Sequence, residues 1–178
     1  PAVGGAIDTT EGVTNVFRRT AFVDNDATSG LKGGSWCYGG AVSAEGGRTT
    51  VDTCVFDYGK KQNAKAYGNA IDFNAVDVSL LNSTFRRGKV EAISAYNSPI
   101  AMTNCVVVGN GSAGDIYIEG ETHVSMAYCA YGVCQVQYPA MVTGVFNLSG
   151  RSDDIYDGAS LRLDGSDFNP VAGLGLRQ

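Results

Sequence analysis

Two short motifs recur along the chain in a fixed order, and this repeat constrains the fold more than any other feature. The first motif ends in an aliphatic anchor, found at Ile7, Val42, Ile71, Ile93 and Ile116. The second is centred on a larger apolar anchor, found at Phe22, Phe56, Phe85, Val107 and Tyr131. Successive second anchors lie 34, 29, 22 and 24 residues apart. A repeat of this length predicts a solenoid whose units stack on their neighbours.

Residues between the anchors also fall into columns. Seven and five residues before the second anchor, four of the five pairs are apolar or β-branched, as in Val78 with Leu80. Small side chains stand two residues before it, at Thr20, Cys54, Ser83, Cys105 and Cys129. Strand side chains alternate between faces, so each repeat holds three short strands. The step of three residues between the second and third strands breaks the alternation and predicts a bend, where Asn82 and Asn104 lie.

These columns predict an all-β fold, a right-handed parallel β-helix of about five to six coils with three short strands per coil. Residues 1–134 form the coils. Residues 135–178 contain a candidate sixth coil around Ala140, Met141 and Leu148, followed by a C-terminal capping segment with a strand at 160–164. A β-sandwich would also show alternating strands, but it gives no reason for five columns without gaps.

Composition excludes several classes of protein. The chain is 44% hydrophobic and 17% charged, which is too apolar for a disordered segment. Its net charge of -5 disfavours a nucleic-acid-binding domain, which is normally basic. No apolar run approaches the roughly 20 residues of a transmembrane helix. With 178 residues, we expect one soluble domain.

The first coil carries a recognisable pair of motifs. Gly4-Gly5-Ala6-Ile7 followed by Phe22-Val23-Asp24-Asn25 resembles the GGAI and FxxN signatures of the polymorphic outer-membrane protein repeats. More broadly, it is similar to bacterial right-handed β-helix proteins of the pectate-lyase-like superfamily. The resemblance covers about residues 4–133 and implies an extracellular or cell-surface setting. That superfamily includes polysaccharide lyases, glycosidases, tailspikes and adhesins, so the resemblance implies the fold without choosing one function.

Length variation is confined to one corner of the coils. From the second anchor to the next first anchor the gaps are 20, 15, 8 and 9 residues, so the first two coils carry long loops there. These loops, at 26–38 and 58–67, contain aromatic and basic residues: Trp36, Tyr38, Tyr58, Lys60, Lys61, Lys65 and Tyr67. Aromatic rings can stack on sugars and lysines attract carboxylate or sulfate groups, which predicts a site for an acidic glycan. In the alternative interpretation, the aromatics cover the helix flank and the lysines protect a strand edge.

Weaker catalytic candidates lie on the outer face of the first strands. Asp8 and Asp72 are outward positions two coils apart, roughly 9–10 Å, near the upper limit for the carboxylate pair of an inverting glycosidase. Arg86 could act as a base or substrate clamp, although a solvent-facing charge is the alternative. Calcium would need converging carboxylates, and Glu45 and Glu119 add no tight cluster, so no cofactor or metal is predicted.

The five cysteines cannot all pair within the chain. Cys105 and Cys129 occupy neighbouring coils of the small-residue column, at a separation that a disulfide permits. Stacked buried thiols are the favoured interpretation, because the same column accepts Thr20 and Ser83.

These features predict a non-catalytic extracellular module that binds an acidic glycan or a cell-surface partner. An anionic-polysaccharide lyase or glycoside hydrolase is the enzyme alternative, and a filament-forming structural subunit is the third. The coil pattern begins at Gly4 with nothing ahead of it to cover the strand edges. We therefore expect either a fragment of a longer protein or head-to-tail docking on another subunit.

Overall fold

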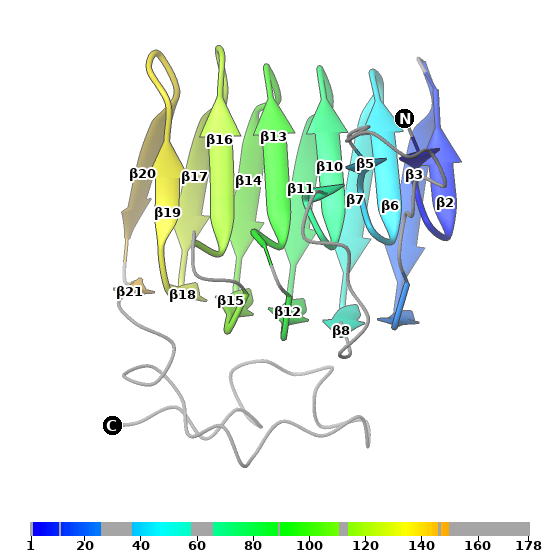
Figure 1. The fold of residues 1–178 in the computed structure, drawn as a ribbon. Helices are drawn as coiled ribbons and strands as arrows, with labels where there is room; N and C mark the ends of the chain where they lie inside the picture. Colours follow the sequence, from blue (N-terminus) through cyan, green and yellow to red (C-terminus); the bar gives the residue numbers. More distant parts are fainter. Residues whose placement is uncertain are drawn as a thin grey trace.

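The computed structural model describes residues 2–10, 12–25, 37–57, 66–88, 90–110, 114–145 and 147–149. Its strands form three parallel six-stranded sheets and one three-stranded sheet. The chain winds through the three large sheets once per coil, which confirms the all-β, right-handed parallel β-helix. Six coils lie side by side in Figure 1, from blue at the first coil to gold at the sixth.

The strands of each sheet come from successive coils. Sheet 1 contains β2 (Ile7–Thr9), β6 (Val42–Glu45), β10 (Ile71–Asn74), β13 (Ile93–Tyr96), β16 (Ile116–Glu119) and β19 (Cys134–Val136). Sheet 2 contains β3 (Thr14–Arg18), β7 (Arg48–Asp52), β11 (Asp77–Leu81), β14 (Ile100–Thr103), β17 (His123–Ala127) and β20 (Met141–Val145). Sheet 3 contains β4 (Ala21–Val23), β8 (Val55–Asp57), β12 (Thr84–Arg86), β15 (Val106–Val108), β18 (Ala130–Tyr131) and β21 (Leu148–Ser149). The short sheet contains β1 (Ala2–Val3), β5 (Cys37–Tyr38) and β9 (Ala66–Tyr67).

The register of the sheets follows the sequence columns. In sheet 1, Ile71 of β10 pairs with Val42 on one side and Ile93 on the other. In sheet 3, Phe56 of β8 pairs with Phe22 and Phe85. Residues 22 to 35 positions apart are therefore direct neighbours, as the repeat predicts.

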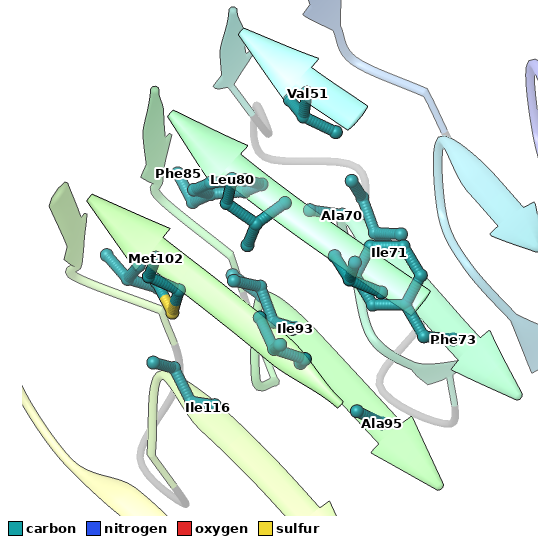
Figure 2. Packing of buried hydrophobic residues seen from close by; sticks show 14 of the residues in the cluster. Val51, Ala70, Ile71, Phe73, Leu80, Phe85, Ile93, Ala95, Met102 and Ile116 are labelled. Carbon is teal, nitrogen blue, oxygen red and sulfur yellow. The ribbon is translucent and has the colours of Figure 1, made fainter. Parts of the chain in front are cut away.

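The core is the interior of the coils. Ile71, Phe73, Leu80 and Phe85 are completely buried, and Figure 2 shows such side chains from successive coils packed in rows. Parallel register places like residues beside like, and the ring of Phe56 lies 4.7 Å from that of Phe85, with only 7° between their planes. Each coil thus covers the apolar interior of its neighbour, which is the source of stability in a solenoid.

The bend between sheets 2 and 3 has the same backbone conformation in five coils. Its left-handed residues, with φ between 47° and 56°, are Arg19, Thr53, Asn82, Asn104 and Tyr128. Asparagine tolerates this conformation well, and the two asparagines also link their coils. Asn104 Nδ2 donates to Asn82 Oδ1 at 2.8 Å. The bend expected at Asn82 and Asn104 is confirmed.

A sixth coil is formed by β19, β20 and β21, each of which extends one of the three large sheets. The expected strand at 160–164 lies outside the described residues. Within the described ranges there is no helix with the length and apolar character of a membrane span.

Candidate functional site

The outer face of sheet 1 carries most of the polar and aromatic side chains of interest. Ile71 and Phe73 of β10 point into the core, so Asp72 and Asn74 point outward. Register extends these positions into two outward columns. The first contains Asp8, Ser43, Asp72, Ser94, Tyr117 and Gln135, and the second contains Glu45, Asn74, Tyr96 and Glu119.

A groove of about 500 Å³ lies on this face. We call it the sheet 1 groove, and its lining includes Tyr38, Tyr67, Asp72, Ser94, Tyr96 and Glu119. The described lining contains no lysine or arginine. Apart from Tyr38 and Tyr67, the lining side chains project from β6, β10, β13 and β16. Each of these strands is paired in parallel register with its neighbours, which fixes the spacing of the side chains.

Three tyrosines form a row across coils at this site. Tyr38 of β5 pairs in register with Tyr67 of β9, and their rings stack with centroids 5.8 Å apart and planes 13° apart. The ring of Tyr67 then meets that of Tyr117 on β16 at 6.4 Å and 42°. Tyr38 and Tyr67 were expected to bind ligand as parts of long loops. The structure places both on the short sheet, at one groove with Asp72.

Glycines hold the short sheet against sheet 1. Gly68 joins Tyr67 of β9 to the coil turn before β10, with a φ of 58°. A Cβ atom at this position would lie 2.2 Å from the carbonyl oxygen of Ile71. Only glycine fits both the left-handed backbone and this close approach, so the position of Tyr67 depends on it.

Asp72 is the most perturbed carboxyl group of the groove. Burial raises the pKa of Asp72 to about 7, a hydrogen bond with Ser94 opposes the rise, and repulsion from Glu91 and Glu119 adds to it. At neutral pH a large fraction of Asp72 is therefore protonated. A carboxylic acid that keeps its proton near pH 7 can donate a hydrogen bond or a proton to a bound molecule.

Neighbouring groups share this environment. Burial raises the pKa of Glu91, whose Oε1 accepts a hydrogen bond from the backbone of Gly68 at 3.2 Å. The hydroxyl of Tyr117 donates to Glu119 Oε2 at 3.0 Å. Burial, together with this hydrogen bond and the charge of Glu119, raises the pKa of Tyr117 to about 12. Tyr117 thus remains protonated and fixes the orientation of the Glu119 carboxylate.

The other catalytic candidates lie elsewhere. Asp8 shares the outward column of Asp72, two strands away, but is not part of the described groove lining. Arg86 lies on sheet 3 and is 1% exposed, so it is neither at the groove nor solvent-facing. Its Nη2 lies 2.9 Å from Oδ2 of the fully buried Asp57 in the neighbouring coil, which balances its charge. Arg86 is therefore a structural residue.

Five of the seven predicted binding residues belong to the two long loops. Trp36, Tyr58, Lys60, Lys61 and Lys65 lie outside the described residues. The prediction of an acidic-glycan site on these loops stays a prediction.

Three residues of the site were missed in the sequence. Asn74 and Tyr96 line the groove, and Glu91 shapes its electrostatics. The signal was available for the first two, because the strand period of two makes the third residue after each first anchor an outward position. Glu91 lies two residues before its first anchor, in the column of Gly5, Gly40 and Asn69, and this column does not signal a buried carboxyl group.

Comparison with known proteins adds no identification. A scan against protein-family models, a search of curated proteins and a search of solved structures each found no match to the chain. No group of three or more histidine, cysteine or acidic side chains in the described part of the chain is arranged to hold a metal ion.

Proposed function

We propose that the protein is a β-helix module that binds a glycan in the sheet 1 groove. The supporting observation is the meeting of stacked tyrosines with carboxyl, amide and hydroxyl side chains in one groove of about 500 Å³. Aromatic rings offer flat apolar surfaces to the C–H faces of sugars, while convergent polar groups fix the orientation of the hydroxyls. The groove volume suits a short oligosaccharide segment.

The charge of the groove favours a neutral or amino-bearing glycan within it. Glu45, Asp72 and Glu119 line the groove, without a cationic partner among the described lining residues. A polyanionic chain would meet repulsion there. The lysines at 60, 61 and 65 favour an acidic glycan instead, and both classes belong in the binding test.

Binding is tested by calorimetric titration of neutral, amino and uronate oligosaccharides. Replacing the stacked ring, Tyr67→Ala, is expected to weaken binding about tenfold or more, since a sugar-facing aromatic surface is lost. Tyr138→Ala is the matched control, because Tyr138 is 96% exposed and lies outside the groove lining. Equal affinity of both variants and the unaltered protein would exclude the groove as the binding site.

Catalysis is a second candidate function, favoured by the raised pKa of Asp72 in the groove. The partly protonated carboxyl group of Asp72 would supply the acid of a glycoside hydrolase, with Glu119 as the second carboxyl group of the same groove. Release of reducing ends that is lost in Asp72→Asn, with oligosaccharide binding retained, would establish hydrolysis. Release of unsaturated uronate ends, detected by ultraviolet absorbance, would instead indicate a lyase.

We further propose an extracellular or cell-surface setting and membership of the pectate-lyase-like superfamily. Both rest on the resemblance of Gly4-Gly5-Ala6-Ile7 and Phe22-Val23-Asp24-Asn25 to repeats of surface proteins. Labelling of intact producing cells with an antibody to the chain tests the setting, and labelling only after lysis would contradict it.

A further inference from the structure

The small-residue column inside the coils brings two thiols together. Val106 of β15 pairs with Ala130 of β18, and the backbone N–H of Ala130 donates to the carbonyl oxygen of Cys105 at 2.9 Å. Cys105 and Cys129 are therefore direct neighbours in the fourth coil (β13–β15) and the fifth (β16–β18). Both are buried free thiols.

The two side chains have the same orientation. Each Sγ lies 3.4 Å from the carbonyl oxygen two residues earlier, that of Thr103 for Cys105 and that of Ala127 for Cys129. Each thiol therefore donates its hydrogen to a backbone carbonyl of its own coil. Neighbouring strands lie roughly 4.8 Å apart, within the Cα range of about 4.4–6.8 Å that disulfides occupy. The Cα spacing of neighbouring strands thus permits a disulfide, and rotation of the two side chains away from their carbonyl partners brings the sulfurs toward each other.

We propose that Cys105 and Cys129 form a reversible disulfide that ties the fourth coil to the fifth. The column makes this pair specific. Cys54 belongs to the same column, but its neighbour in the third coil is Ser83, whose Oγ accepts the backbone N–H of Cys54 at 3.0 Å. Cys134 begins β19 of sheet 1 and lies in a different column.

The chemistry is thiol–disulfide exchange with a low-molecular-weight disulfide such as glutathione disulfide. The adjacent Cys105 thiol lowers the pKa of Cys129, while burial raises the pKa of Cys105, so Cys129 is the first thiolate to form. Its sulfur attacks the small disulfide, giving a mixed disulfide and expelling one thiolate, which takes up a proton. Cys105 then loses its proton and attacks the Cys129 sulfur, expelling the second small thiol. Two protein thiols are oxidised and one small disulfide is reduced to two thiols.

The test uses the full chain incubated with glutathione disulfide, in buffer and in urea below the unfolding transition, where transient opening admits the reagent to the buried sulfurs. Remaining thiols are then blocked in acid, and unreduced peptides are analysed by mass spectrometry. The expected product is a Cys105–Cys129 peptide pair lacking the two thiol hydrogens and separated by dithiothreitol. The oxidised chain should also unfold at a higher urea concentration, a shift that Cys105→Ser and Cys129→Ser abolish and Cys54→Ser retains.

Ser83→Cys supplies a positive control, because it places a thiol next to Cys54 and next to Cys105. Cross-linking of the introduced thiol without any link between Cys105 and Cys129 in the unaltered chain would overturn the proposal. So would a link from Cys129 to Cys134, or glutathione adducts alone, in either condition.

Discussion

At the scale of single residues, stacking of like side chains dominates this protein. Parallel register places Phe22, Phe56 and Phe85 in one row, with ring centroids 4.6 and 4.7 Å apart. Phe56 is completely buried between the other two rings, whereas Phe22 is 6% exposed at the first coil. A phenylalanine inside the row is therefore expected to contribute more to the free energy of unfolding than one at its end.

Phe56→Ala is expected to lower the free energy of unfolding by about 3–5 kcal/mol, since it removes two ring contacts and leaves a cavity. Urea denaturation followed by circular dichroism measures this change. Phe22→Ala is the matched control and should lower the free energy of unfolding less. Phe22 is 6% exposed and has a stacked ring on one side only, while its second ring contact, with Phe17, is edge-on at 5.7 Å. Equal losses of unfolding free energy in the two variants would show that stacking between rings of neighbouring coils does not stabilise the protein.

Asp72 makes a second prediction at this scale. Burial raises its pKa from 3.8 to about 7, so the folded chain retains a proton that the unfolded chain has lost. Its contribution to stability therefore falls as pH rises from about 4 to about 7 and is constant above that. Asp72→Asn should remove this part of the pH dependence, measured as urea midpoints across the range.

Ser94→Ala is the second variant of this test, because the hydrogen bond from Ser94 lowers the pKa of Asp72. Without this hydrogen bond the pKa of Asp72 should rise further, so stability should continue to fall to a higher pH. An unchanged profile in both variants would contradict the assignment of the slope to Asp72.

At the scale of elements, each coil consists of short strands, and the turns that join them include backbone conformations that few residue types adopt. β9 and β10 are joined through Gly68, and β5 and β6 through Gly39 in the same way. A Cβ on either glycine would lie within 2.2 Å of a backbone carbonyl oxygen of the following strand. These turns couple the tyrosines of the short sheet to the carboxylates of sheet 1.

Gly68→Ala should destabilise the protein by more than about 2 kcal/mol, since left-handed strain adds to a backbone clash. Glycan binding should weaken as well, because Tyr67 is displaced. Gly12→Ala separates the two effects: Gly12 has a φ of 79° but no atom within 4 Å of the added Cβ. Gly12→Ala should lower the free energy of unfolding only by the backbone strain, about 1–2 kcal/mol. Thermal melts of both variants test this, and equal losses would argue against the clash.

At the scale of the whole molecule, the coils are stacked layers that share one register. Ala92 is aligned with Asp115, and Ile93 pairs with Ile116, so residues 93–115 make one full turn of the helix. The interfaces above and below this turn have the same register. Stability is then close to a sum over coils and their contacts.

Deletion of residues 93–115 should therefore yield a folded protein with one coil fewer. Its denaturant m value should fall by roughly one sixth, in proportion to the surface buried. Deletion of residues 93–103 is the control, because it removes part of a turn and breaks every downstream register. If both deletions unfold the protein, the coils are not independent layers.

The sequence by itself determined the coils, their register and the bend at Asn82 and Asn104, because a period of two within strands and a repeat between them leave one way to bury every anchor. Only the tertiary structure decided where chemistry can occur. Tyr67 meets Tyr117, 50 positions later in the chain, because coils stack and the short sheet lies beside sheet 1. The burial of Arg86 and the raised pKa of Asp72 likewise depend on neighbours from other coils, which no local pattern specifies.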